Sequence, residues 1–144
     1  MHALTEGLED YLEAILVCES EHRFVRTKHI AEKMNVSSPS AHAAVKELAK
    51  MGLVEHESYG YIELTSEGRN QAEKVYSKHK VLFRFFRDFL GLPDDTSEAN
   101  ACGIEHHFDD LTTKRFRRVF EFLLSKIAED KDFEEELKKA LKND

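Results

Sequence analysis

Apolar side chains recur at helical spacing through most of the chain. In residues 6–20 they fall on one face of an amphipathic helix, and shorter helices are expected at residues 27–34 and 37–51. A serine at position 37 or 38 can accept hydrogen bonds from the first backbone N–H groups of the third helix, and Gly52 ends that helix. The last two helices, joined by a tight turn, form a helix-turn-helix.

The pattern changes after this motif. Residues 53–65 alternate imperfectly, are rich in β-formers and turn at Ser58-Tyr59-Gly60, which predicts a hairpin. Helical spacing then returns, and the further helices are expected at residues 65–90, 97–108, 112–128 and 132–142. The fold is therefore mainly α: an N-terminal winged helix-turn-helix with a small β-hairpin wing (residues 1–66), followed by an all-helical domain (residues 67–144).

Composition limits the class of protein. The 144 residues are 41% hydrophobic with a mean hydropathy of -0.53, and they include no apolar run near the ~18 residues that a membrane span requires. The N-terminus has no signal-peptide core, so we expect a cytoplasmic protein without membrane partners. Two cysteines at positions 18 and 102 are too few for a disulfide framework.

Charge is distributed unevenly around the formal net charge of -7. Residues 23–50 contain six basic and two acidic side chains, whereas residues 92–110 contain six acidic side chains and no lysine or arginine. The basic stretch suits DNA phosphates and the acidic stretch suits a cation, although each by itself is also typical of a solvated surface.

The second helix of a helix-turn-helix enters the major groove, and its N-terminal residues face the base edges. Small side chains at these positions let the helix approach the bases closely, and lysines suit contacts with phosphate or guanine. A winged helix that binds protein instead is the less frequent use of this geometry. The candidate DNA-contacting residues are Lys28, Ser37, Ser38, Pro39, Ser40, Ala41, His42 and Lys46.

The densest cluster of potential metal ligands is residues 102–107, CGIEHH. On a helix, Cys102, Glu105 and His106 share one face, so a thiolate, a carboxylate and an imidazole converge within about one turn. Each residue alone is more often structural, but the three together in an acidic neighbourhood favour a metal site. His79 lies on an apolar stripe and Asp10 beside Glu13 on a helix surface, and spacing alone gives them no role.

The sequence at this point resembles the diphtheria-toxin-repressor and manganese-transport-regulator family of metal-dependent transcriptional repressors, up to about residue 128. The matching segments are residues 8–15 (LEDYLEAI), the winged helix through residues 64–68 (LTSEG), the helix around His79, and residues 103–107 (GIEHH). The resemblance implies a homodimer that binds a pseudo-palindromic DNA operator and represses metal-uptake genes when metal is bound. By position it implies one or two neighbouring metal sites with the ligands Asp10, Glu13, His79, Cys102, Glu105 and His106.

The departures from the family pattern concern the metal. Manganese-responding members resemble this chain at Asp10 and Glu13 but have a carboxylate in place of Cys102, whereas iron-responding members have the cysteine and a methionine in place of Asp10. Phe83 stands where some members have a carboxylate. Thiolate favours Fe(II), Co(II) or Zn(II), and hard oxygens suit Mn(II), so Fe(II) and Mn(II) both stay open as the cofactor. The chain ends at Asp144, and we therefore expect the short form without the C-terminal SH3-like domain.

Two other classes of function make different demands on the chain. A metal-independent winged-helix regulator that responds to another ligand would bind DNA equally well after chelation. An enzyme is not expected, because the chain has no His-Glu-x-x-His helix and no glycine-rich phosphate loop, and no organic substrate is implied.

Overall fold

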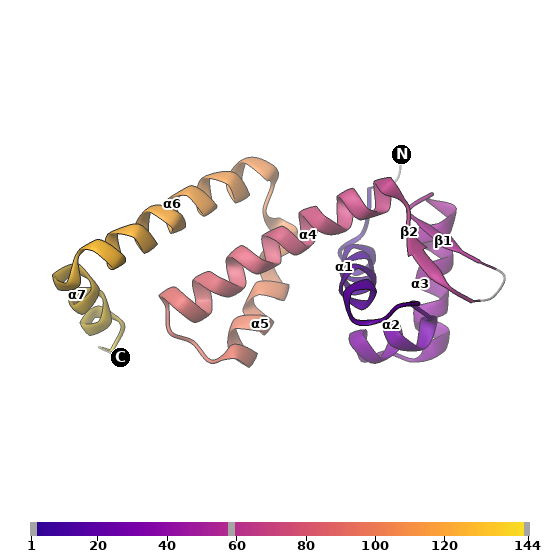
Figure 1. Cartoon of the computed structure of the whole chain (residues 1–144), viewed down its shortest axis with the longest axis horizontal. Coiled ribbons are helices and arrows are strands. Elements are labelled where there is room, and N and C mark those ends of the chain that lie inside the picture. Colours follow the sequence, from indigo (N-terminus) through magenta and orange to yellow (C-terminus); the bar gives the residue numbers. More distant parts are fainter. Residues whose placement is uncertain (1–2, 58–59, 143–144) are drawn as a thin grey trace. The chain divides into compact units, whose positions relative to one another are not determined.

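The computed structural model describes residues 3–57 and 60–142. Contacts divide the chain into two compact units, one up to Ser77 and one from Lys78 onward, and each is described by itself (Figure 1). The boundary between sequence domains that is expected after residue 66 stays a prediction.

The first unit is a winged helix-turn-helix, as expected. Its elements are α1 (Glu6–Glu21), α2 (Thr27–Met34), α3 (Ser38–Lys50), β1 (Val54–His56), β2 (Ile62–Leu64) and the beginning of α4 (Ser66–Arg84). The Ser37 hydroxyl caps α3 by accepting the Ser40 N–H at 3.3 Å, and Gly52 follows the helix with a positive φ of 72°. In the wing, Val54 pairs with Leu64 and His56 with Ile62 in antiparallel register. Two residues of the expected turn, Ser58 and Tyr59, lie outside the described residues.

One continuous apolar core holds this unit together. Side chains of α1, α2, α3 and both strands meet in it, including the fully buried Leu12, Ile30 and Leu48. The first turn of α4 approaches the end of this core so closely that a Cβ on Gly68 would lie 1.8 Å from the Leu53 carbonyl oxygen. Glycine is therefore required there, because any larger residue would push α4 away from the backbone before β1.

The second unit is all-helical, as expected, and is built around phenylalanine rings. Its elements are the end of α4, a π-helical turn (Phe85–Phe89), α5 (Asp94–Ile104), a 3-10 turn (Glu105–His107), α6 (Asp110–Glu129) and α7 (Lys131–Leu141). The Phe85 ring meets those of Phe116 and Phe120 edge to face, with centroids 5.0 and 5.6 Å away. None of the described helices has the length and apolar character needed to cross a bilayer.

Two helix boundaries differ from the sequence expectation. The long helix expected to reach Leu90 keeps α geometry only to Arg84 and then widens into the π turn, which follows the clustering of the phenylalanine rings. The helix expected at residues 97–108 begins at Asp94, where carboxylates in the first turn suit the positive helix end. It also ends at Ile104, so the α-helical placement of Glu105 and His106 was wrong: both lie on a 3-10 turn.

Candidate metal centre

Three predicted ligands meet inside the second unit. His79 comes from α4, Cys102 from α5 and Glu105 from the 3-10 turn, and one ligand atom from each lies within 4.8 Å of the other two. The Sγ atom of Cys102 is 3.7 Å from His79 Nδ1. Although Glu105 has left the α-helix that the sequence predicted, the tighter turn keeps its carboxylate on the side of Cys102.

His79 is held between two carboxylates. Its Nδ1 atom lies 2.7 Å from Glu105 Oε2 and its Nε2 atom lies 3.0 Å from Glu98 Oε2. The side chain is buried, with 6% of the residue exposed. An imidazole with an acidic oxygen at each nitrogen sits in a strongly electronegative environment, which suits a cation.

Glu105 supplies the strongest indication of a ligand. Its carboxylate is fully buried, and among the described residues its Oε1 atom has no hydrogen-bond partner. The Nε2 atom of His106 lies 3.5 Å from that oxygen. A buried carboxylate oxygen without a donor costs free energy unless something positive satisfies it. The imidazole, thiol and carboxylate donors present here therefore fit a divalent transition metal.

Glu98 also belongs to this cluster, although it is absent from the ligands predicted from the sequence. Its Oε1 atom is 3.9 Å from Cys102 Sγ, and its Oε2 atom contacts His79. The signal was spacing, because positions 98 and 102 are four residues apart on one helix and therefore share a face.

The loop after the 3-10 turn is tied back to the helix that carries His79. Lys78 donates from Nζ to the Phe108 carbonyl at 2.7 Å, and the same ammonium lies 3.8 Å from Asp110 Oδ1. Asp109 caps α6 by accepting the Thr112 N–H at 2.6 Å, and this bond lowers the pKa of its carboxyl. The segment that follows the turn carrying Glu105 is thus fixed.

The remaining predicted metal ligands lie on other elements. His106 follows Glu105 on the 3-10 turn, and its side chain is nearly buried. Asp10 and Glu13 lie on α1 in the first unit, both partly buried and one helical turn apart. Their membership of a metal site stays a prediction.

The predicted DNA-contacting residues gather at the N-terminal half of α3. Ser37, Ser38, Pro39 and Ser40 are exposed there, as are His42, Lys46 and, on α2, Lys28. The His42 ring meets that of His56 in the wing with centroids 5.7 Å apart. Ala41 was a wrong choice, because it is fully buried in the core beneath α3. Its side chain faces the protein interior and not the exposed surface of α3.

Family comparisons agree with both units. Residues 3–62 match the model of the iron-dependent repressor N-terminal DNA-binding domain, and residues 65–141 match that of the iron-dependent repressor metal-binding and dimerisation domain. The Mycobacterium tuberculosis iron-dependent repressor IdeR is 31% identical over 119 residues, which are 83% of this chain and 52% of IdeR. Bacillus subtilis MntR, a transcriptional regulator, is 28% identical over 135 residues, 94% of each chain. The chain therefore spans about half of IdeR but nearly all of MntR.

Solved structures show the same fold. The manganese regulator SloR matches with a TM-score of 0.72 and 29% identity, over 83% of this chain and 55% of SloR. A manganese-dependent transcriptional repressor in complex with manganese also matches with a TM-score of 0.72, at 31% identity over 80% of this chain and 53% of that one. Family members are DNA-binding regulators and not enzymes. From its winged helix, its helical unit and these matches, the chain belongs to the family of metal-dependent transcriptional repressors that includes IdeR and MntR.

Proposed function

We propose that this protein is a cytoplasmic homodimeric repressor that binds a pseudo-palindromic DNA operator and represses metal-uptake genes when Fe(II) or Mn(II) is bound. The observation that carries the proposal is the buried carboxylate of Glu105, which lacks a donor on Oε1 and lies beside His79 and Cys102. A site of this kind has its lowest free energy with a cation present.

The proposed ligands come from both units. His79, Cys102, Glu105 and His106 lie on the second unit, and Asp10 and Glu13 lie on α1 of the first. A bound divalent cation would supply the positive charge that lets these carboxylates lie together. Carboxylates gathered in one site without that charge would repel one another.

A ligand set shared by two units explains how metal can control DNA binding. Residues on α1 belong to the same compact unit as the recognition helix α3, so holding α1 restricts α3 as well. In a dimer this restriction favours recognition helices spaced about 34 Å apart, which matches successive major grooves. Coupling between such sites is typically about 1–3 kcal/mol, equivalent to roughly 5–150-fold in DNA affinity.

The donor types favour no single metal. Cys102 brings a soft sulfur that suits Fe(II), and Co(II) or Zn(II) in vitro, whereas Asp10, Glu13 and Glu105 bring hard oxygens that suit Mn(II). Whether Cys102 is a ligand is therefore the question that separates the iron response from the manganese response.

An anaerobic titration of the reduced protein with Co(II) tests the site. We expect saturable binding with a sulfur-to-metal charge-transfer band that disappears in Cys102→Ser. The matched control is Cys18→Ala, which should keep the band, because Cys18 is buried in the first unit and burial raises the pKa of its thiol. Tight binding without the band would make the site one of oxygen and nitrogen and favour manganese. Absence of binding would overturn the metal-dependent function.

DNA binding is measured with and without the metal. We expect Co(II) to tighten binding of the wild type and to have no effect on Glu105→Ala. Equal DNA affinity after chelation would instead identify a metal-independent winged-helix regulator.

A further inference from the structure

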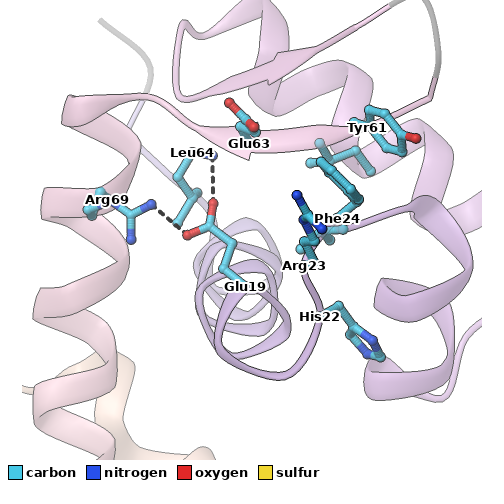
Figure 2. A pocket seen from close by; sticks show the side chains of 10 residues that line it. Glu19, His22, Arg23, Phe24, Tyr61, Glu63, Leu64 and Arg69 are labelled. Carbon is cyan, nitrogen blue, oxygen red and sulfur yellow. Dashed lines mark hydrogen bonds and ion pairs between the residues drawn. The ribbon is translucent and has the colours of Figure 1, made fainter.

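Two arginines and two aromatic rings form a stack beside the wing, in the first unit. The Arg23 guanidinium lies 5.3 Å from the centroid of the Phe24 ring, and the Phe24 and Tyr61 rings are stacked with centroids 4.7 Å apart. The Arg26 guanidinium lies 5.1 Å from the Tyr61 centroid, and its Nη2 donates to the Tyr61 hydroxyl at 3.4 Å. We call Arg23, Phe24, Tyr61 and Arg26 the arginine–aromatic stack. Figure 2 shows three of its members, Arg23, Phe24 and Tyr61, along one wall of a cavity of about 330 Å³.

Backbone pairing explains why the stack faces outward. Val25 forms a bridge with Ile62, and both side chains are buried in the core. Because neighbouring residues of an extended strand point to opposite faces, Phe24, Arg26 and Tyr61 lie on the outer face of this small sheet. Phe24 stays 48% exposed as a result. Its ring is therefore accessible on the outer face while it stays packed against Tyr61.

Within the described part of the chain, neither arginine of the stack forms an ion pair with a carboxylate, whereas other cations of this unit do. Arg69 is paired with Glu19 at 2.6 Å, as Figure 2 shows, and Lys33 is paired with Glu21 at 2.7 Å. Arg23 and Arg26 instead contact aromatic rings. A guanidinium stacked on a ring is held in place while its N–H edge stays available, and that edge matches the geometry of a phosphate.

The position of the stack points to DNA as its partner. Arg26 is the N-cap residue of α2, and the exposed Lys28 lies in the first turn of that helix. The N–H groups and dipole at a helix N-terminus attract phosphate as well. Glu63 lies on the same face of the strand as Tyr61 and lines the cavity with Arg23 and Phe24, and it is paired across the strands with the exposed Glu55. The surface best suited to phosphate therefore lies at Arg26 and the beginning of α2.

We propose that the arginine–aromatic stack binds the sugar–phosphate backbone of double-stranded DNA, next to the groove that α3 enters. This inference rests on the proposed DNA-binding function and adds to it a contact that is independent of base sequence. Backbone contacts set register and affinity, and base contacts set specificity. The stack therefore contributes equally to operator and non-operator DNA.

The test uses the full-length protein and a fluorescently labelled duplex of mixed sequence, with affinity measured by anisotropy over a series of salt concentrations, with and without Co(II). Each phosphate contact adds about 0.9 to the slope of log affinity against log salt concentration. We expect Arg23→Ala and Arg26→Ala each to lower the slope by about that amount. Phe24→Ala should weaken binding, whereas Phe24→Tyr, which keeps the stacking ring, should restore it. Circular dichroism of each variant confirms that it is folded.

The matched control is Lys74→Ala, which removes an exposed cation from α4 in the same unit and should leave the slope unchanged. If the wild type binds the duplex and both arginine variants keep its slope, the stack does not contact DNA and the proposal fails while the proposed function stands. If the slopes fall but Co(II) has no effect on any protein, the stack is supported and the metal dependence is not. If the wild type binds no duplex at low salt, both are overturned.

Discussion

The interiors of the two units differ in chemistry. Among the described residues, every buried side chain of the first unit is apolar, whereas His79, Ser97, Glu105 and Thr113, which are the buried polar and charged residues, all lie in the second. The first unit can reach its fold by burying apolar surface alone. The second contains a carboxylate that its own hydrogen bonds leave incompletely satisfied. One unit is thus complete as a folded body, and the other is built to be completed by a cation.

The largest effect on stability is expected from a substitution in the apolar core of the first unit. Leu48 is fully buried between α3 and its neighbours, so Leu48→Ala should lower the free energy of unfolding by about 2–5 kcal/mol through lost burial and a cavity. Urea unfolding followed by circular dichroism measures the change. The loss should be the same with and without Co(II), because no ligand contributes to this core.

The control for that experiment is Lys50→Ala at the exposed end of α3, which should stay within about 0.5 kcal/mol of the wild type. A Leu48→Ala variant that Co(II) restored to wild-type stability would show that the first unit also depends on metal.

The stability of the second unit, in contrast, should depend on bound metal. At a Co(II) concentration about 100 times the Kd, bound metal adds about 2.7 kcal/mol to the stability of the wild type. Glu105→Ala removes the buried carboxylate and should gain none of this stabilisation, as measured by calorimetry with and without Co(II). Glu121→Ala, at an exposed position on α6, should respond like the wild type. Full stabilisation of Glu105→Ala would remove that residue from the site.

A smaller effect is expected at Lys78, which positions the ligand turn through the Phe108 carbonyl. Residues that orient ligands typically change metal affinity by about 10–100-fold. We expect Lys78→Met to weaken Co(II) binding within this range and Lys78→Arg to restore most of it, as measured by competition with a chelator. A lower unfolding temperature with unchanged Co(II) affinity would show that Lys78 supports the fold and not the site.

The sequence predicted the first unit more closely than the second. Serine at position 37, Gly52 and the alternating residues of the hairpin are local signals, and the structure confirms the helix-turn-helix and wing that they indicate. Local signals suffice there because caps, turns and one apolar core agree with one another. In the second unit the helix ends were misplaced, since phenylalanine packing and the 3-10 turn depend on neighbours distant in sequence.

By itself, then, the sequence determined the mainly α fold, the helix-turn-helix and the residue types available to a metal, because periodicity, capping and side-chain chemistry are properties of short segments. The family resemblance implied that His79, Cys102 and Glu105 share a site, but only the tertiary structure gave their distances, added Glu98 to the cluster, and left one buried oxygen without a donor. It alone also stacked Arg23 and Arg26 on the rings of Phe24 and Tyr61. These arrangements join residues that lie far apart along the chain, and packing between elements decides which of them meet.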